Sequence, residues 1–417
     1  GADATCTKGQ CAWQCQPGRG DCDAQAANGC EADLGEVTHC GTCSQSCLDT
    51  HGTPSCQAGK CAIACQPGHA VCDGSPALGC VIDLTTDPQN CGSCGHDCQG
   101  DACEGGLCTP TTVSTGNTRP FQLLVDATHL YWINLGDEQK DGGNNAYFVN
   151  SSVRRLDTLT TLDAKTLAAQ QPWSYILAQQ GGSLYLMNLG TSGSSFKDGR
   201  LWRFDKSTLV GKELRAQVQY GLGMASGADG LFFGESLLRN LFRANLDGTG
   251  ELKLRNDEET ITSMAAAEGQ VFWVRRNNLN GPNAVIRRGA LAADRKSFTA
   301  TSDLSAKETS PDRMWADGDS VYYVNQGEAG RVRRIDQATG QVVTVAENVS
   351  QPQYVTADAT HIYWTECGTS PRVMRVDKAT LTPSVVAQGD CAVGLAVDAK
   401  WVYYSAFVKG EIRRVAR

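Results

Sequence analysis

Two Cys-x-x-Cys motifs, CGTC at 40–43 and CGSC at 91–94, have a spacing that could support metal binding or redox chemistry. Such pairs occur in zinc sites and in thioredoxin-like redox centres. A redox centre needs a βαβ context, which the surrounding sequence lacks, and a zinc site needs thiolates kept in a reducing compartment. Eighteen of the twenty cysteines lie between Cys6 and Cys108. Because this density is typical of a disulfide scaffold, we expect structural disulfides at both motifs.

These cysteines belong to a tandem repeat. The five cysteines from Cys6 to Cys30 recur fifty residues later, and CQPGRGDCD at 15–23 corresponds to CQPGHAVCD at 65–73. Cys103 and Cys108 begin a third, truncated copy. A module with so little apolar content depends on its cross-links, each of which contributes about 2–4 kcal/mol. The pairing stays open, since eighteen cysteines allow too many connectivities.

The repeat region, roughly residues 6–108, contains NCGSCGHDC at 90–98 preceded by GCVIDL at 79–84. It resembles the cysteine-rich repeats of the plant stigma-specific Stig family and related modules in secreted bacterial proteins. The resemblance implies an extracellular protein and no particular activity. We therefore expect a secreted or cell-surface protein whose signal segment preceded Gly1, with anchoring through a processed N-terminus as an alternative.

Charge and hydropathy argue against a nucleic-acid partner and against a transmembrane segment. Residues 1–110 carry three basic side chains against thirteen acidic ones, and the whole chain has a net charge of −8. No basic stripe with interleaved aromatics occurs, so we expect no nucleic-acid partner. No apolar run approaches the roughly 18 residues that span a bilayer, so we expect no transmembrane segment.

From residue 120 onward the pattern changes to strands with period-two alternation. Seven aromatic-rich segments recur every 40–54 residues, and each is followed by a strand that carries an arginine. The aromatic segments are 130–134, 184–188, 231–235, 271–275, 321–325, 362–366 and 402–406, and the arginines are Arg155, Arg203, Arg243, Arg287, Arg334, Arg375 and Arg414. This spacing predicts an all-β, seven-bladed β-propeller of four-stranded blades at residues 109–417, after a disulfide-rich repeat region at 1–108. We expect the arginines to pack on the aromatic strands.

The last blade lacks an outer strand, because the chain ends at Arg417. The β-branched segment TTVST at 111–115 precedes the first blade and can supply that strand. We expect it to close the ring and remove an exposed sheet edge.

Two segments, LRNLFRANLDGTG at 238–250 and IYWT at 362–365, resemble the YWTD propellers of lipoprotein-receptor type. The resemblance covers about 300 residues and supports the fold. Two features depart from it, since those propellers have six blades and the final Asp of YWTD is Glu366 here. We therefore infer no ligand for this chain from its resemblance to those receptors.

Polar residues that recur from blade to blade have a structural interpretation. Asp126, Asp317, Asp358 and Asp398 precede the aromatic strands by four residues, where an aspartate can bind its own backbone in a turn. The propeller has two histidines, His129 and His361, both in this same turn. Histidine acid–base catalysis and a multi-histidine metal site are therefore disfavoured, and we predict no catalytic residue and no metal ligand.

The long loops after the aromatic strands break the blade symmetry and are the candidate binding surface. They lie at 135–148, 189–199 and 276–283, all on one face, and aromatic and basic residues before the inner strands should face the same mouth. The candidate ligand-binding residues are Asp137, Glu138, Asn144, Asn145, Trp173, Lys197, Asp198, Tyr220, Asn277, Asn278, Arg313 and Tyr354. An alternative is that these loops are solvated insertions.

We predict a disulfide between Cys367 and Cys391. Cys367 directly follows the aromatic strand of blade 6, and Cys391 precedes the inner strand of blade 7. Both connections open on the same face of neighbouring blades. Free thiols are the alternative, which an oxidising compartment disfavours.

The favoured function is a non-enzymatic extracellular binding protein, with the propeller as ligand-binding head and the repeats as stalk. Its expected partner is an extracellular protein or glycan. We expect no cofactor, although calcium is compatible without a motif that indicates it. The alternatives are a lyase- or lactonase-type propeller enzyme with a carboxylate-bound divalent metal, and a structural subunit of an extracellular assembly.

Overall fold

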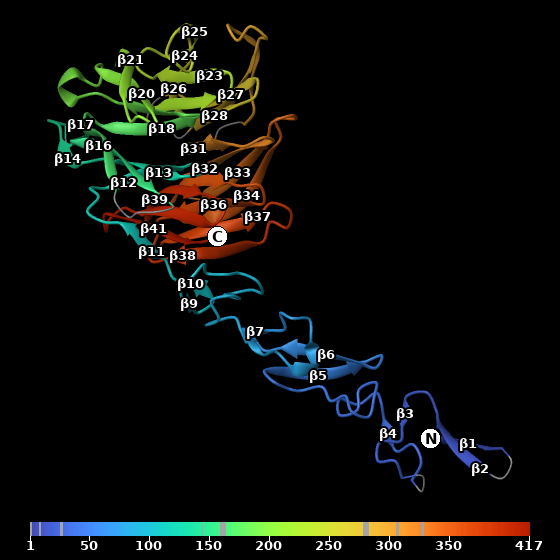
Figure 1. Cartoon of the computed structure of the whole chain (residues 1–417). Coiled ribbons are helices and arrows are strands. Elements are labelled where there is room, and N and C mark those ends of the chain that lie inside the picture. The colour runs from blue at the N-terminus through green and yellow to red at the C-terminus, as the bar shows by residue number, and fades with distance from the viewer. Residues whose placement is uncertain are drawn as a thin grey trace. The chain divides into compact units, whose positions relative to one another are not determined.

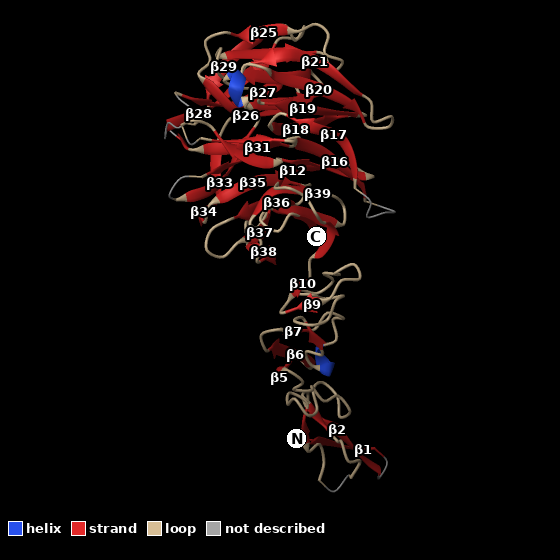
Figure 2. Ribbon diagram, turned by 90° about the vertical axis from the view of Figure 1, so that its left-hand side faces the viewer, coloured by secondary structure: helices blue, strands red, loops and turns tan. Residues whose placement is uncertain are grey.

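The computed structural model describes residues 2–7, 10–25, 28–143, 145–158, 164–277, 283–305, 308–326 and 329–417. The chain divides into two compact units between Thr109 and Pro110. Strands dominate both units, which confirms the all-β prediction (Figure 2). Two short 3₁₀ turns interrupt them, η1 (Pro76–Leu78) and η2 (Ser192–Ser194). Within the described ranges, no helix is both long and apolar enough to cross a membrane.

The first unit consists of short two-stranded sheets joined by loops (Figure 1). Its strands are β1 (Ala2–Thr7), β2 (Gln10–Cys15), β3 (Arg19–Gly20), β4 (Ala32–Asp33), β5 (Gly52–Gln57), β6 (Lys60–Cys65), β7 (His69–Ala70), β8 (Ile82–Asp83), β9 (Cys103–Glu104) and β10 (Leu107–Cys108). Disulfides join most of the cysteines in this unit, as expected from their density. The bonds are Cys15–Cys30, Cys22–Cys43, Cys40–Cys56, Cys47–Cys61, Cys65–Cys80, Cys72–Cys94, Cys91–Cys103 and Cys98–Cys108.

The disulfide pattern shows that the structural module is offset from the sequence repeat. The second copy's hairpin β5–β6 is bonded to the end of the first copy through Cys40–Cys56 and Cys47–Cys61. Hairpin β9–β10 is bonded to the second copy in the same manner. Hairpins β5–β6 and β9–β10 are therefore each covalently fixed by the copy that precedes them. Since the four cysteines of the two Cys-x-x-Cys motifs each form a disulfide with a cysteine outside the motif, these motifs are neither redox pairs nor zinc knuckles.

The second unit is a seven-bladed propeller, as predicted (Figure 1). Strands A to D run from the inside of each blade to the outside, as antiparallel neighbours. Blade 1 contains β12 (Pro120–Val125), β13 (His129–Asn134), β16 (Ser151–Asp157) and β17 (Lys165–Gln171); blade 2 contains β18 (Ser174–Gln180), β19 (Ser183–Asn188), β20 (Gly199–Asp205) and β21 (Gly211–Val218); blade 3 contains β22 (Gly223–Gly227), β23 (Gly230–Glu235), β24 (Asn240–Ala244) and β25 (Leu252–Arg255). Blade 4 contains β26 (Thr260–Ala267), β27 (Gln270–Arg276), β28 (Asn283–Leu291) and β29 (Phe298–Asp303), with β30 (Glu308–Thr309) added beside β28; blade 5 contains β31 (Pro311–Ala316), β32 (Ser320–Asn325), β33 (Gly330–Asp336) and β34 (Val342–Val349); blade 6 contains β35 (Pro352–Ala357), β36 (His361–Glu366), β37 (Arg372–Asp377) and β38 (Pro383–Gln388).

Blade 7 is built from both ends of the propeller sequence. It contains β39 (Ala392–Val397), β40 (Trp401–Ala406) and β41 (Glu411–Ala416), and β11 (Thr111–Ser114) pairs with β41 as the outer strand. The residue pairs are Thr111 with Arg414 and Thr112 with Arg413. The segment expected to close the ring therefore takes that place.

The aromatic B strands form the core because both of their faces are covered by neighbouring blades. Trp132, Trp273 and Trp364 are each at most 2% exposed. The turns that precede these strands are fixed as predicted: the carboxylate of Asp126 accepts the backbone N–H groups of Thr128 and His129, at 3.0 and 2.9 Å. The same bonds recur at the other three aspartates.

The repeated arginine was misplaced in blade 4. Arg155 pairs across the strands with Tyr131, but the equivalent Phe272 pairs with Arg288 and not with Arg287. The adjacent arginines cannot be told apart by spacing, yet a one-residue shift places a side chain on the opposite face of a strand.

The expected packing of these arginines on aromatic rings is also largely replaced by hydrogen bonds. Arg414 lies 4.1 Å from the Trp401 ring, but Arg155 and Arg243 donate to backbone carbonyls. Lysine ammonium groups lie over some of the rings instead; Lys206 Nζ, for example, lies 5.3 Å from the centroid of the Tyr131 ring. The guanidinium donors find acceptors nearer than the rings.

A disulfide joins Cys367 and Cys391, the pair predicted from their positions, with the two Cα atoms 4.6 Å apart. It connects blade 6 to blade 7 beside the ring closure. We expect Cys367→Ser with Cys391→Ser to lower the free energy of unfolding by about 3 kcal/mol, because the bond closes a loop of 24 residues in the unfolded chain. Denaturant titration of both proteins measures this, and peptide mapping without reduction checks the pairing. Equal midpoints would contradict the expected stabilisation.

Candidate functional site

The loops that join strands B and C form the rim of one face, together with the D–A connections. In blade 1 the predicted loop has its own two-stranded sheet, β14 (Asp137–Lys140) and β15 (Ala146–Val149). Glu138 forms an ion pair with Arg119 at 3.2 Å, and Asp137 accepts a hydrogen bond from Asn150. Asn145 donates to the Asp141 carboxylate at the hairpin tip. These predicted residues thus organise the hairpin and are exposed on it.

In blade 2 the loop is folded around Asp198. Its carboxylate accepts the backbone N–H and the hydroxyl of Thr191, at 2.7 and 2.8 Å, and the Ser194 hydroxyl. These hydrogen bonds lower the pKa of Asp198 despite the opposing effect of burial. Lys197 is exposed beside it. Asp198 is therefore a loop-shaping residue rather than a free carboxylate.

These two loops contribute aromatic rings to one cluster on the rim. Phe148 from the blade 1 hairpin and Phe196 from the blade 2 loop contact Trp173 edge-on, with ring centroids 5.4 and 5.7 Å away. Phe196 also contacts Tyr220, at 5.5 Å. All four side chains are partly buried, and the Trp173 indole N–H has no acceptor among the described residues. We call Phe148, Trp173, Phe196 and Tyr220 the rim cluster.

A second group lies where the inner strands begin. The Arg313 guanidinium of blade 5 lies 4.6 Å from the Phe121 ring of blade 1 and 5.0 Å from the Tyr175 ring of blade 2. Tyr175 also contacts Trp173 of the rim cluster, at 6.4 Å. Burial raises the pKa of Tyr175 and that of Tyr354, so both phenols stay neutral. The structure thus links Arg313 to the rim cluster through a continuous series of rings.

Some predicted residues do not join these groups. Asn277 is exposed on blade 4, and no contact places it in the rim cluster. Asn144 and Asn278 lie outside the described residues. Sequence reasoning missed Phe121, Tyr175, Phe148 and Phe196. Phe148 and Phe196 had a usable signal, because each is an aromatic residue within a loop that breaks the blade symmetry.

The inner strands of blades 1 to 6 line a cavity of about 550 Å³. Arg313 and Tyr354 line it near the start of the A strands, whereas Glu268 lines it in the A–B turn of blade 4. Several polar lining groups bond neighbouring strands: Gln122 donates to Leu177 O at 2.8 Å, and Ser226 donates to Gln179 O at 3.1 Å. These side chains therefore use their hydrogen bonds to hold together the strands that form the cavity wall.

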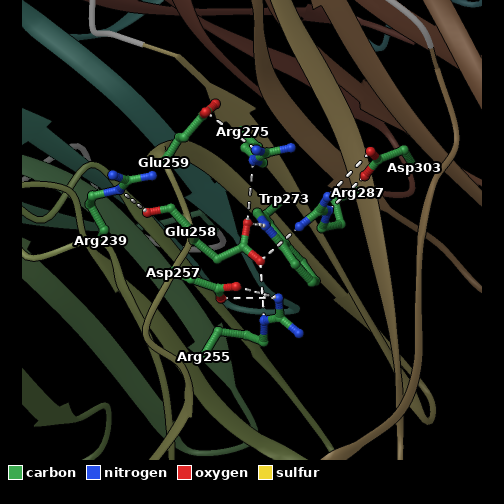
Figure 3. Close-up of polar contacts among 9 residues, drawn as sticks. All are labelled: Arg239, Arg255, Asp257, Glu258, Glu259, Trp273, Arg275, Arg287 and Asp303. Atoms are coloured by element: carbon green, nitrogen blue, oxygen red, sulfur yellow. Dashed lines mark hydrogen bonds and ion pairs between the residues drawn. The ribbon is translucent and has the colours of Figure 1, made fainter.

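Buried carboxylates on the loop face belong to arginine clusters (Figure 3). Glu258 is fully buried, and its carboxylate lies 3.1 Å from both the Trp273 indole nitrogen and Arg287 Nη1. Arg255 and Arg275 flank the same carboxylate, with nitrogen–oxygen distances of 3.3 and 4.0 Å. Arg287 also pairs with Asp303 and holds the pKa of that carboxyl below its usual range.

This arrangement recurs in other blades. Glu308 accepts from Tyr323 and lies 3.4 Å from Arg333, and Glu366 accepts from Trp364 and pairs with Arg372 at 2.9 Å. Such a carboxylate is already neutralised and hydrogen-bonded. These groups therefore stabilise the blades and are poor candidates for binding a divalent metal.

Comparisons with known proteins support the fold and identify no family. No protein-family model matches the chain, and no curated protein matches it significantly. Among solved structures, the chain is similar to U3-55K (TM-score 0.54, 8% identity) and to hydrazine synthase of Kuenenia stuttgartiensis (TM-score 0.53, 13% identity). Each similarity covers 74% of this chain and 98% of the other.

Further similarities are more partial. A puromycin-hydrolysing peptidase of Mycobacterium tuberculosis matches with a TM-score of 0.51 and 14% identity, over 69% of this chain and 48% of the peptidase chain. A chain of a nidogen/laminin complex is 16% identical, with a TM-score of only 0.39 over 56% of this chain. At these identities the likeness shows the fold alone, since one fold hosts many functions.

Proposed function

We propose that this is an extracytoplasmic binding protein whose propeller is the binding head and whose repeat region is a spacer. The oxidised cysteines support an oxidising compartment. The rim cluster is the observation that carries the binding role. Aromatic side chains with arginine nearby are enriched at binding hot spots, because they bury a large area and offer few flexible torsions.

The rim cluster packs against the core through Phe148 and Trp173 and also reaches the surface. Two of its rings, Phe148 and Phe196, come from the loops that depart most from the blade pattern, and all four rings are partly exposed. An extracellular protein or glycan fits this combination of flat rings and peripheral polar groups such as Glu138, Lys197 and Asn145.

The geometry gives less support to the enzyme alternative. A metal-dependent lactonase or lyase needs several carboxylates that converge on the channel. Among the described residues that line the cavity, Glu268 is the one carboxylate, and it lies in an A–B turn. The buried carboxylates on the loop face are already paired with arginines.

Truncation of the rim cluster tests the proposed function. The full chain is screened on arrays of extracellular glycans and proteins, and its affinity for each captured partner is then measured. We expect Phe196→Ala to weaken binding by about 2 kcal/mol or more, which is roughly 30-fold, because its ring joins Trp173 to Tyr220.

Val210→Ala is the matched control. Val210 is a 66% exposed apolar residue in a C–D turn, on the opposite face of the propeller. It should leave affinity unchanged. Binding that survives Phe196→Ala but is lost with the control would place the binding surface elsewhere.

A further inference from the structure

The wall of the central cavity is asymmetric at one level of the propeller. Strand pairing identifies an equivalent residue in each A strand, which lies two positions before the residue paired with the first aromatic of the B strand. These residues are Gln122, Ile176, Gly223, Ser263, Arg313, Tyr354 and Gly394. Arg313 is the one charged member of the set. A residue that breaks the symmetry of a repeated framework is a candidate for function.

Arg313 also departs from its equivalents in backbone conformation. Its φ is +45°, in the left-handed region that is unfavourable for a residue with a long side chain. None of the equivalent non-glycine residues has a positive φ. The Ser263 hydroxyl accepts the N–H of Met314 at 3.0 Å, and this bond helps to hold the strand in that conformation.

The charge of Arg313 is not neutralised in the structure. Among the described residues, no carboxylate lies within 4.0 Å of its guanidinium nitrogens. The Asp312 carboxylate accepts the Arg313 backbone N–H at 2.8 Å and does not form an ion pair with the side chain. Two rings, Phe121 and Tyr175, flank the guanidinium and restrict it. An unpaired charge in a partly buried position is costly, and an anionic ligand would offset that cost. The guanidinium is complementary to a carboxylate, which accepts several hydrogen bonds in one plane.

The remainder of the cavity selects the body of the ligand. Partly exposed apolar side chains line the wall, including Ala266, Met314 and Trp315. A volume of about 550 Å³ is within the usual range for small-molecule sites. Glu268 in the A–B turn, away from Arg313, would repel a second negative charge. The wall therefore suits a monoanion with an apolar body.

We propose that the central cavity binds a small monocarboxylate with an aliphatic body, whose carboxylate pairs with Arg313. This site goes beyond the macromolecular binding proposed for the rim and does not depend on it. The probes are decanoate and the matched neutral decan-1-ol, titrated calorimetrically into the full chain. We expect decanoate to bind at least about tenfold more tightly, because the charge-assisted hydrogen bonds exist for the carboxylate alone.

Two variants locate the interaction. Arg313→Met keeps much of the apolar contact with Phe121 and Tyr175, and we expect it to abolish the preference for decanoate. Ala266→Leu leaves the charge in place and fills part of the cavity, because Ala266 lines the cavity and is partly exposed, so it should weaken both probes. Arg200→Met is the control, since Arg200 is an exposed arginine paired with Glu213. It should preserve the preference.

Several results would overturn the proposal. They are equal affinities for the two probes in the wild type, no binding of decanoate, or a preference that survives Arg313→Met. If Arg313→Met fails to fold, undiminished decanoate binding by Ala266→Leu still rejects the cavity. Phe196→Ala separates the two sites: loss of macromolecular binding with unchanged decanoate affinity would show that the rim and the cavity act independently.

Discussion

Removal of residues 110–116 from the isolated propeller should lower its free energy of unfolding by roughly 3–5 kcal/mol. These residues contain β11, the outer strand of blade 7. Val113 is 4% exposed and packs in a cluster with Trp132, Tyr403 and Ile412, so its loss exposes an apolar surface. The backbone hydrogen bonds between β11 and β41 are lost as well.

The comparison is between residues 110–417 and residues 117–417, by thermal and denaturant unfolding. The longer protein should fold without the repeat region, because the two units are separately compact. A synthetic peptide of residues 109–116, added in excess to the shorter protein, should restore part of the stability by occupying the open edge of β41. Equal unfolding midpoints for the two proteins would show that β11 does not stabilise the ring.

Glu258→Gln should destabilise the propeller by about 3–5 kcal/mol, although it changes little in shape. The wild-type carboxylate is fully buried and is surrounded by Arg255, Arg275 and Arg287 (Figure 3). An amide leaves three guanidinium groups without their shared counter-charge. It also places donor hydrogens against donors, unlike the carboxylate, which accepts from Trp273 and Arg287.

Glu251→Gln is the matched control for this prediction. Glu251 pairs with Arg215 at 2.8 Å, but its side chain is 38% exposed. Because exposed ion pairs are screened by water, its loss should cost about 0–1 kcal/mol. Denaturant unfolding of both variants gives the comparison. A Glu258→Gln protein that unfolds within 1 kcal/mol of the wild type would mean that the cluster is not a stabilising unit.

The sequence by itself determined the blades, their number and the way in which the ring closes. Period-two alternation specifies a strand and its buried face, and the aromatic segments recur once per blade. Ring closure followed from counting strands, since blade 7 lacked one and TTVST was available. The Cys367–Cys391 bond also followed, because propeller topology places consecutive connections on the same face of neighbouring blades.

Only the tertiary structure decided the contacts between elements distant in sequence. The repeat alone could not show that hairpins β5–β6 and β9–β10 are each bonded to the preceding copy, as in Cys40–Cys56, because cysteines of identical spacing are interchangeable in a one-dimensional pattern. Arg287 and Arg288 were indistinguishable for the same reason until strand register separated them.

The candidate sites depended most strongly on the three-dimensional arrangement. Arg313 was selected from its position near an inner strand, but its stacking with Phe121 and Tyr175 joins blade 5 to blades 1 and 2. Local alternation encodes which face of a strand is buried. It does not encode which rings meet across a channel, because those distances depend on the curvature of the closed ring and the folding of its loops.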